Sequence, residues 1–176
     1  MIEIMPAPTL TTSRLTLASP GPADLEESAA MWAAPQVYGA IGGRIFTREE
    51  VWHRLLRYIG HWEAVGYGGW TVRETATGRY VGDVTIMDSR RATRPSFEGI
   101  PEVGWVLCPW AHGQGFAAEA LAALFGWADP RLPRTICMID PANTRSIRLA
   151  ERFDYRPYTE ASYKDTPTLL FRRLAY

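Results

Sequence analysis

Two glycines and two alanines cluster in LCPWAHGQGFAAEAL, residues 107–121, where an apolar strand gives way to an alanine-rich helix. The first backbone N–H groups of a helix have no partner within it, and the helix dipole puts partial positive charge there. Gly113, Gly115, Ala117 and Ala118 would let a phosphate approach these groups closely. A tight glycine turn followed by alanines that pack on a sheet explains the same residues, so composition alone leaves both interpretations open.

The segment GQGFAA also satisfies G-x-G-x-x-A, the dinucleotide-binding pattern, and Asp140 lies about 20 residues later, where an acid that binds ribose is expected. Three features count against a nicotinamide cofactor. Pro109 and a further loop separate the strand from the first glycine. Too few residues follow the motif to build a doubly wound domain, and the strands before it form an antiparallel meander. Dinucleotide binding therefore remains a remote alternative.

Length and composition are those of one ordinary globular domain spanning residues 1–176, with 47% hydrophobic and 22% charged residues. The 19 basic and 19 acidic residues give a net charge of zero, which predicts neither nucleic acid nor an anionic membrane as a partner. No apolar run approaches the roughly 20 residues that span a bilayer. MIEIMPAPTL, residues 1–10, has no secretory pattern, so we expect a cytoplasmic protein.

Cysteines and histidines show no spacing typical of a metal site. Cys108 and Cys137 each end an apolar strand-like run, and we interpret them as buried free thiols in a reducing compartment. His53, His61 and His112 are scattered along the chain. The sequence therefore predicts no bound metal.

Hydrophobic periodicity predicts the elements that must position the glycine loop. In the first half it indicates a strand at 13–19, a helix at 21–34, a helix-poor stretch, and a helix at 47–66 that begins with a Thr47–Glu50 capping box. The buried face of this second helix is expected to comprise Val51, Leu55, Tyr58, Ile59 and Trp62. Strands at 68–75, 79–87 and 102–108 then form an antiparallel meander.

The second half alternates helices and strands. A helix at 115–128, a strand at 134–140, a helix at 143–153 and a last strand within 168–176 are predicted. A strand, helix, strand succession implies a right-handed crossover, so the strands at 102–108 and 134–140 should pair in parallel. The predicted fold is a mixed α/β sheet that is antiparallel in its first half.

The run EVGWVLCPWAHGQGFAAEAL, followed by NTRSIRLAERFDYRP, resembles the GNAT superfamily of N-acetyltransferases, and within it the Rim-like branch that acetylates ribosomal protein N-termini. The resemblance covers nearly the whole chain and implies the GNAT fold, with a splayed parallel strand pair at the acetyl-CoA site and flanking helices. The family loop Gln/Arg-x-x-Gly-x-Gly/Ala wraps the pyrophosphate of acetyl-CoA. His112, Gly115 and Ala117 take its fixed positions, and the histidine is a departure from the family pattern.

The resemblance also implies which residues bind acetyl-CoA as co-substrate. The pyrophosphate would accept hydrogen bonds from backbone amides of the loop, and the pantetheine arm would bind the unpaired backbone of the preceding strand, as an added strand does. The loop residues are Gly113, Gly115, Phe116, Ala117 and Ala118, and the strand residues are Val106, Leu107 and Cys108.

Acetyl transfer by direct attack in a ternary complex needs a neutral amine, an oxyanion donor and help for the departing thiolate. Glu102 matches the acidic strand position that serves as base in several family members. Strand alternation places it on the same face as Gly104, where the missing side chain could admit substrate. Alternatively, Glu102 is a solvated carboxylate at a strand start or the partner of an arginine.

Asn143 and Ser146 resemble the Asn-x-x-Ser that begins the family's next helix, and Asn143 is also a good N-cap. Many members carry a tyrosine acid where this chain has Ala150, so Ser146 is the expected donor to the thiolate. Arg145 and Arg148 either meet the nucleotide phosphate or are solvated helix arginines.

The resemblance makes a peptide or protein N-terminus the first candidate for the amine acceptor. A small amine acceptor stays open, as does a sensor or scaffold that binds CoA without turnover. Relatives commonly form homodimers, which the sequence does not establish for this chain. Aromatic residues in the first half are expected to be core rather than a substrate cage: Trp32, Tyr38, Trp62, Tyr67 and Trp70.

Overall fold

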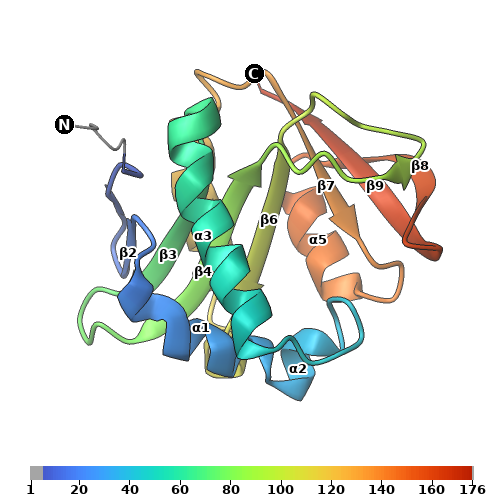
Figure 1. Cartoon of the computed structure of the whole chain (residues 1–176). Helices are drawn as coiled ribbons and strands as arrows, with labels where there is room; N and C mark the ends of the chain where they lie inside the picture. The colour runs from blue at the N-terminus through green and yellow to red at the C-terminus, as the bar shows by residue number, and fades with distance from the viewer. Residues whose placement is uncertain (1–5, 176) are drawn as a thin grey trace.

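A central sheet of nine strands organises the part of the chain that the computed structural model describes, residues 6–175 (Figure 1). Residues 1–5 and 176, which include part of the N-terminal segment and the end of the expected last strand, lie outside it. The strands are β1 (Leu10–Thr11), β2 (Leu15–Ala18), β3 (Gly69–Glu74), β4 (Tyr80–Met87), β5 (Thr93–Arg94), β6 (Glu102–Leu107), β7 (Arg134–Ile139), β8 (Arg156–Tyr163) and β9 (Thr166–Leu174).

The strand order is β1-β2-β3-β4-β6-β7-β9-β8-β5, and every neighbouring pair is antiparallel except β6 and β7. The β4–β6 ladder is continuous from Met87↔Glu102 to Gly82↔Leu107. In contrast, β6 and β7 pair only at Glu102↔Ile136. The two parallel strands therefore separate beyond Glu102, which confirms the mixed sheet and the splayed pair.

Helices cover both faces of the sheet. They are α1 (Leu25–Trp32), α2 (Pro35–Tyr38), α3 (Arg48–Val65), α4 (Phe116–Ala128) and α5 (Thr144–Arg152), with short 3-10 turns at Pro22–Asp24 and Pro109–Ala111. The helices α1 and α3 cross the front of the sheet in Figure 1 and share a buried cluster with Val106 of β6. The opposite face packs against α4, and the ring of Phe125 in α4 lies 5.2 Å from that of Phe153, just after α5.

Most of the elements predicted from periodicity are present. The capping box of α3 is confirmed, because Glu50 N donates to Thr47 Oγ1 at 3.2 Å and Thr47 N to Glu50 Oε2 at 2.8 Å. Of the expected buried face of this helix, Ile59 is only partly buried. The three expected core tryptophans are buried, and Trp62 and Trp70 pack against each other with ring centroids 4.7 Å apart.

Some elements were not predicted. The helix-poor stretch contains the short α2, and β1, β5 and β8 were missed. Strand β8, RPYTEASY, is largely exposed, so it shows no alternation of apolar residues that would mark it. The last strand also begins earlier than expected, at Thr166.

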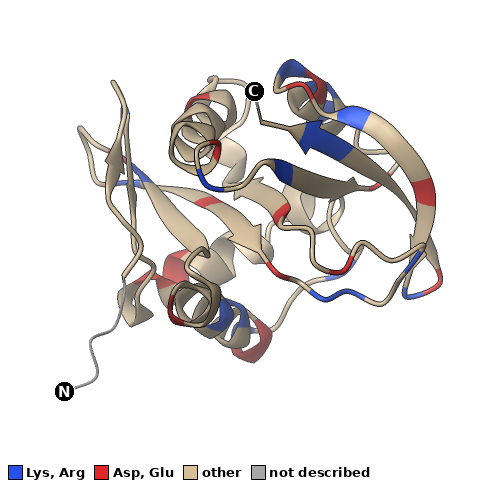
Figure 2. Ribbon diagram, turned by 90° about the horizontal axis from the view of Figure 1, so that it is seen from above, with Lys and Arg blue, Asp and Glu red and all other residues tan. Residues whose placement is uncertain are grey.

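Charged residues of both signs are interspersed over the elements (Figure 2). Among residues 6–175, none of the helices has the length and apolar character needed to cross a bilayer. The same described residues bring together no group of His, Cys, Asp and Glu side chains that could hold a metal ion.

The approach of β4 to β6 depends on Gly82. This residue has φ +152°, and a Cβ there would lie 2.1 Å from the carbonyl oxygen of Val106 on the partner strand. We predict that Gly82→Ala lowers the free energy of unfolding by about 2 to 4 kcal/mol, because backbone rather than a flexible side chain must move. Urea denaturation measures this loss.

Gly60 provides the matched control. It lies inside α3, and a Cβ there meets nothing within 4 Å. We expect Gly60→Ala to raise stability by roughly 0.5 to 1 kcal/mol, since alanine is the better helix former. Equal denaturation midpoints for Gly82→Ala and the unmodified protein would contradict the close approach.

Candidate functional site

The glycine loop connects the end of β6 to α4 at the point where β6 and β7 have separated. Gly113 and Gly115 both adopt the left-handed conformation, with φ of +74° and +78°, and Gly115 is the N-cap of α4. Both glycines are exposed, and a Cβ at Gly113 would meet nothing within 4 Å. The glycines are therefore needed for the path of the backbone rather than for packing.

The N–H groups of residues 113–118, termed the loop amides below, are free of protein partners. Within the described part of the chain none of them donates a hydrogen bond, and the first amide of α4 that does so is that of Glu119, to Gly115 O at 3.0 Å. Buried or partly buried backbone donors are normally paired. Ala117 and Ala118 are only half-buried, so an acceptor can approach the start of the helix from solvent. The arrangement fits an anion with several oxygens.

Arg14 and Glu119 fix this loop to the start of β2. The Arg14 guanidinium pairs with Glu119 Oε2 at 2.6 Å and donates to Gln114 O at 3.0 Å. It also lies 4.5 Å from the centroid of the Phe116 ring. Thr12 Oγ1 donates to Glu119 Oε1 at 2.5 Å. Sequence reasoning missed these contacts because the partners are about a hundred residues apart and no local pattern joins them.

His112 connects the loop to the neighbouring helix through its side chain. Arg145 Nη1 donates to His112 Nδ1 at 2.8 Å, so Nε2 carries the ring proton and donates to Leu107 O at 2.9 Å. The tautomer follows because an arginine can only donate. The histidine thus connects the start of α5 to the end of β6.

The backbone N–H and C=O groups of successive β6 residues point alternately toward β4 and toward β7. Cys108 N donates to Val81 O at 2.8 Å, so Val106 and Cys108 direct their backbone groups toward β4. Alternation turns the N–H and C=O of Leu107 toward the opening beside β7. Its C=O is taken by His112, which leaves the Leu107 N–H as the donor that faces the opening. Burial raises the pKa of the Cys108 thiol to about 11, so it stays protonated at neutral pH.

The start of α5 lies at the same edge of the sheet as the loop amides, because both helices follow parallel strands. Asn143 is the N-cap, and its Oδ1 accepts from Ser146 N at 3.1 Å. The half-buried Ser146 hydroxyl makes no hydrogen bond within residues 6–175. Arg148 is exposed. The predicted residues at the starts of α4 and α5 thus lie at the same edge of the sheet. The Arg145 side chain makes a hydrogen bond to His112.

Glu102 lies at the other end of β6, on the face covered by α1 and α3. Its side chain is 9% exposed, and Oε2 accepts from Arg91 Nε at 2.7 Å. Gly104 lies on the same face opposite Thr85, whose Oγ1 would be 3.0 Å from a Cβ at Gly104. The structure therefore shows Glu102 as the partner of an arginine, beside a position without a side chain that we term the acceptor gap.

Asp83 of β4 is a second carboxyl on this face, and sequence reasoning missed it. It is 1% exposed, and Oδ1 accepts from Tyr80 Oη at 2.8 Å. Burial raises the pKa of Asp83 to about 7, although the hydrogen bond from Tyr80 lowers it. The sequence VGDV shows an acid within an apolar strand, which was the available signal.

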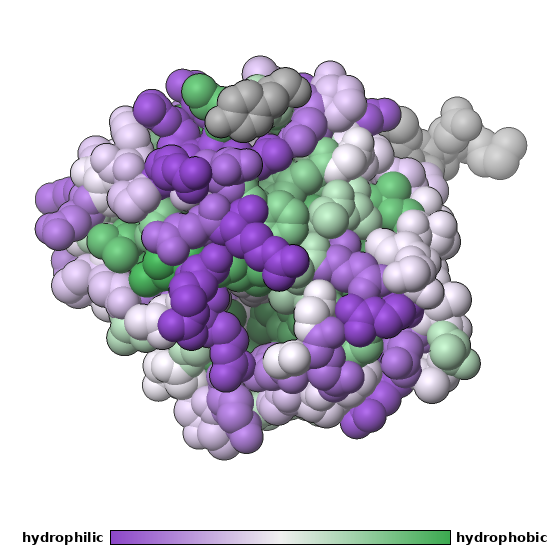
Figure 3. All heavy atoms as spheres, turned by 180° about the vertical axis from the view of Figure 1, so that it is seen from behind, coloured by the Kyte–Doolittle hydropathy of each residue, from purple (hydrophilic) through white to green (hydrophobic). Residues whose placement is uncertain are grey.

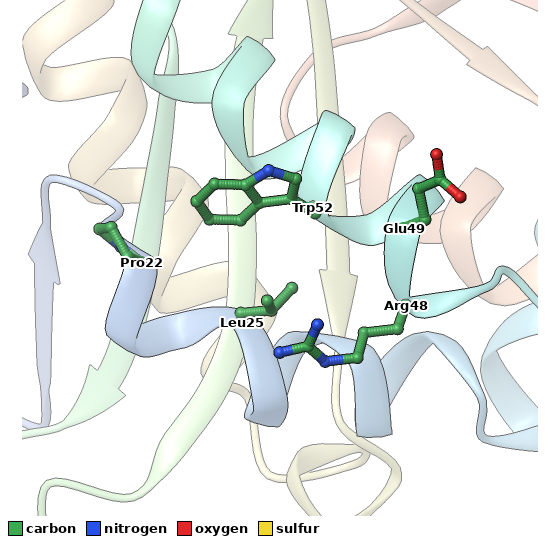
Figure 4. A pocket seen from close by; sticks show the side chains of 5 residues that line it. All are labelled: Pro22, Leu25, Arg48, Glu49 and Trp52. Atoms are coloured by element: carbon green, nitrogen blue, oxygen red, sulfur yellow. The ribbon is translucent and has the colours of Figure 1, made fainter.

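A space-filling view and a close-up show two hollowed areas of the surface. Figure 3 shows the face behind the view of Figure 1, where hydrophilic side chains cross a hydrophobic area that is hollowed beside them. Another depression lies between α1 and the start of α3, lined by Pro22, Leu25, Arg48, Glu49 and Trp52 (Figure 4). It is lined by none of the site residues described above.

Residues 14–156 match the family model of the acetyltransferase (GNAT) domain. This chain belongs to the GNAT acetyltransferase family. A GnaT-family acetyltransferase of Bordetella pertussis has a TM-score of 0.83 to this GNAT chain, with 30% identity and coverage of 95% of this chain and 99% of its own. The uncharacterised Bacillus subtilis protein YkkB is 27% identical over 116 residues, and the match covers 63% of this chain but only 64% of that relative.

Two GNAT structures of lower identity share the fold. Spermidine N-acetyltransferase of Vibrio cholerae, in complex with CoA and spermine, has a TM-score of 0.71 at 14% identity over 93% of this chain and 97% of its own. RimL, the ribosomal L7/L12 alpha-N-protein acetyltransferase, in complex with coenzyme A, has a TM-score of 0.73 at 13% identity. The match covers 95% of this chain and 98% of the RimL chain. At these identities the likeness shows the fold alone. The antiparallel first half also excludes the doubly wound domain that dinucleotide binding needs.

Protonation of Asp83 makes stability depend on pH. Its folded pKa, about 7, lies above the ordinary value of 3.8, so between these values the folded state holds a proton that the unfolded chain has released. Its contribution to stability is complete below pH 4 and is lost as the pH rises toward 7. We predict that Asp83→Asn removes a slope of up to about 1.4 kcal/mol per pH unit in that window.

The measurement is urea denaturation of both proteins at a series of pH values. At about pH 3 and below, Asp83 is mostly protonated in both the folded and the unfolded chain, so the difference there measures the effect of the amide itself. Above pH 4 the stability of the variant should improve steadily relative to the unmodified protein. Parallel curves would show that Asp83 does not titrate in this range.

Proposed function

We propose that the chain is an acetyl-CoA-dependent N-acetyltransferase, folded as one domain over residues 1–176, that transfers acetyl to a primary amine. The observation that carries the proposal is the run of loop amides from Gly113 to Ala118 at the N-terminus of α4, which have no partner within the described part of the chain. A diphosphate supplies the oxygens that these donors lack. The zero net charge of the chain is no obstacle, because the donors are backbone groups.

The residues fit the rest of the coenzyme as well. The Leu107 N–H faces the opening between β6 and β7, where an extended pantetheine arm adds to the edge of β6. Acetyl-CoA supplies the acyl group as an activated thioester. The free Ser146 hydroxyl, at the helix start capped by Asn143, donates a hydrogen bond to the sulfur as charge develops there.

Attack occurs from the face covered by α1 and α3. The acceptor gap at Gly104 admits the amine, and Glu102 provides negative charge beside it. Because Arg91 already donates to Oε2, we assign Glu102 to holding the acceptor amine beside the gap rather than to taking its proton. The acceptor that we propose is the α-amine of a peptide or protein N-terminus, as in the Rim-like branch that the sequence resembles.

We predict that Ala118→Glu weakens CoA binding by about tenfold or more, because it places a carboxylate at the helix start that holds the diphosphate. Ala122→Glu adds the same charge to an exposed position of the same helix and should leave the affinity unchanged. Isothermal titration with CoA measures both. Equal affinities in the two variants would contradict the diphosphate site.

Release of free thiol from acetyl-CoA tests turnover, with N-terminal peptides and small amines as acceptors. The double variant Glu102→Gln, Ser146→Ala is expected to lose about 10²-fold or more in kcat. Glu151→Gln, on the exposed side of α5, is its control and should keep full activity. Tight CoA binding without acetylation of any acceptor would instead identify a sensor or scaffold.

A further inference from the structure

Asp83 has an unsatisfied oxygen in the interior of the protein. Its Oδ1 accepts from Tyr80 Oη at 2.8 Å, whereas Oδ2 is buried and has no hydrogen-bond partner among residues 6–175. A buried acceptor without a partner costs folding free energy, so its retention calls for a reason. A proton on Oδ2 removes the negative charge that burial penalises, and a group that binds and releases a proton there is suited to acid–base chemistry.

The strand register places Asp83 beside the acceptor gap. Asp83 pairs with Val106 and Thr85 with Gly104 in the β4–β6 ladder, so all their side-chain positions lie on the α1 and α3 face. Asp83 is therefore the diagonal neighbour of Gly104, about 7 to 8 Å away between Cα atoms. An amine that binds at Gly104, beside Thr85, would reach Asp83 directly or through one bridging water.

The two carboxyls that flank the gap differ in their partners. Glu102 is bound to the Arg91 guanidinium, which always donates and never takes a proton. Asp83 has no such ion pair within the described residues, although arginines lie near it. Arg54 instead stacks on the Trp32 ring, 4.2 Å from its centroid, and Arg73 is held by Asp24 at 2.7 Å. Asp83 is thus the carboxyl that is free to take up a proton.

We propose that Asp83 accepts the proton of the acceptor ammonium and that Tyr80 positions it. This inference rests on the proposed function and deepens it. The N–H bond of the ammonium breaks, directly or through one water, and the proton moves to Asp83 Oδ2, so the carboxylate becomes a carboxylic acid. The lone pair left on nitrogen then forms the C–N bond to the acetyl carbon as the C–S bond of the thioester breaks. The CoA thiolate leaves and takes up the second proton that the nitrogen loses. After product release Asp83 returns the proton to solvent.

Charged and titratable groups face Asp83 from every element packed around it. They are Asp24 before α1, Arg54 and Tyr58 of α3, Arg73 of β3, Tyr80 of β4 and Cys108 after β6. Burial raises the pKa of Asp83, and the charge of Asp24 raises it further. The Tyr80 hydrogen bond and the charges of the arginines lower this pKa, which leaves it at about 7. A base with a pKa near the working pH is effective.

A pKa of about 7 for Asp83 discriminates between classes of amine. An α-ammonium group, with a pKa near 8, passes its proton to Asp83 at a cost of about tenfold in the equilibrium constant, whereas a lysine ammonium near 10.4 costs about 10³-fold. The site therefore favours an α-amine, as at a peptide N-terminus, over an alkylamine.

The test measures kcat from about pH 5.5 to 9 with saturating acetyl-CoA and a saturating short peptide that has a free N-terminal serine. The unmodified protein should lose activity below a midpoint near the pKa of Asp83. Asp83→Asn should lower kcat by about 10²-fold or more. The decrease of kcat toward low pH, termed the acidic limb, should also disappear in this variant. Tyr80→Phe removes the donor to Oδ1, so the limb should move to higher pH, a change that a purely structural role does not produce.

Asp88→Asn is the matched control, since Asp88 follows β4 and pairs with Arg90 outside the gap. It should keep the profile of the unmodified protein. The inference is overturned if Asp83→Asn keeps the acidic limb, or if Tyr80→Phe leaves its midpoint in place. It is also overturned if Glu102→Gln alone removes the limb.

A second measurement separates this inference from the proposed function. Carbon-13 NMR of the folded protein without acceptor follows the Asp83 carboxyl directly, and a midpoint near 4 would overturn the inference while acetylation of the peptide still upheld the transferase. Failure to acetylate any acceptor while CoA binds would contradict the transferase itself, and the proton step with it.

Discussion

The separation of β6 from β7 is the constraint on which the rest of the site depends. These parallel strands pair only at Glu102↔Ile136, although the other edge of β6 is fully paired with β4. The opening exposes a strand edge and places the starts of α4 and α5 at the same end of the sheet. His112 spans these parts, since it binds Leu107 O and receives a hydrogen bond from Arg145. Among residues 6–175, the loop amides have no hydrogen-bond partner.

The two faces of the sheet divide the chemistry between them. On the loop side the donors are backbone groups, and the nearby Arg14 is used to hold Glu119 and the loop rather than to bind an anion. The α1 and α3 face carries the side chains to which we assign the proposed acceptor and proton roles, with Glu102 bound to Arg91 and Asp83 to Tyr80. Gly104 lies between these two carboxyls in the ladder. One strand, β6, therefore borders both halves of the proposed ternary complex.

Local signals explain what was predictable from the sequence. The helix starts at Thr47, Gly115 and Asn143 are encoded by residues within a few positions of each other, and they were found. Contacts between distant segments were not predicted, because hydrophobic periodicity carries no information about them. The Arg14–Glu119 ion pair is one such contact, and the burial of Asp83 beneath α1 and α3 is another. The exposed strand β8 was missed since it lacks an apolar face. The predicted site residues were identified from the resemblance to the family. The residues that contact them could be identified only from the three-dimensional structure.

The central claim is that the loop amides bind the diphosphate of coenzyme A. A crystal structure of the protein with CoA tests it most directly. The account predicts diphosphate oxygens at about 2.9 Å from backbone nitrogens between residues 113 and 118. A diphosphate bound elsewhere, or loop amides that instead hold a side chain of the protein, would contradict it.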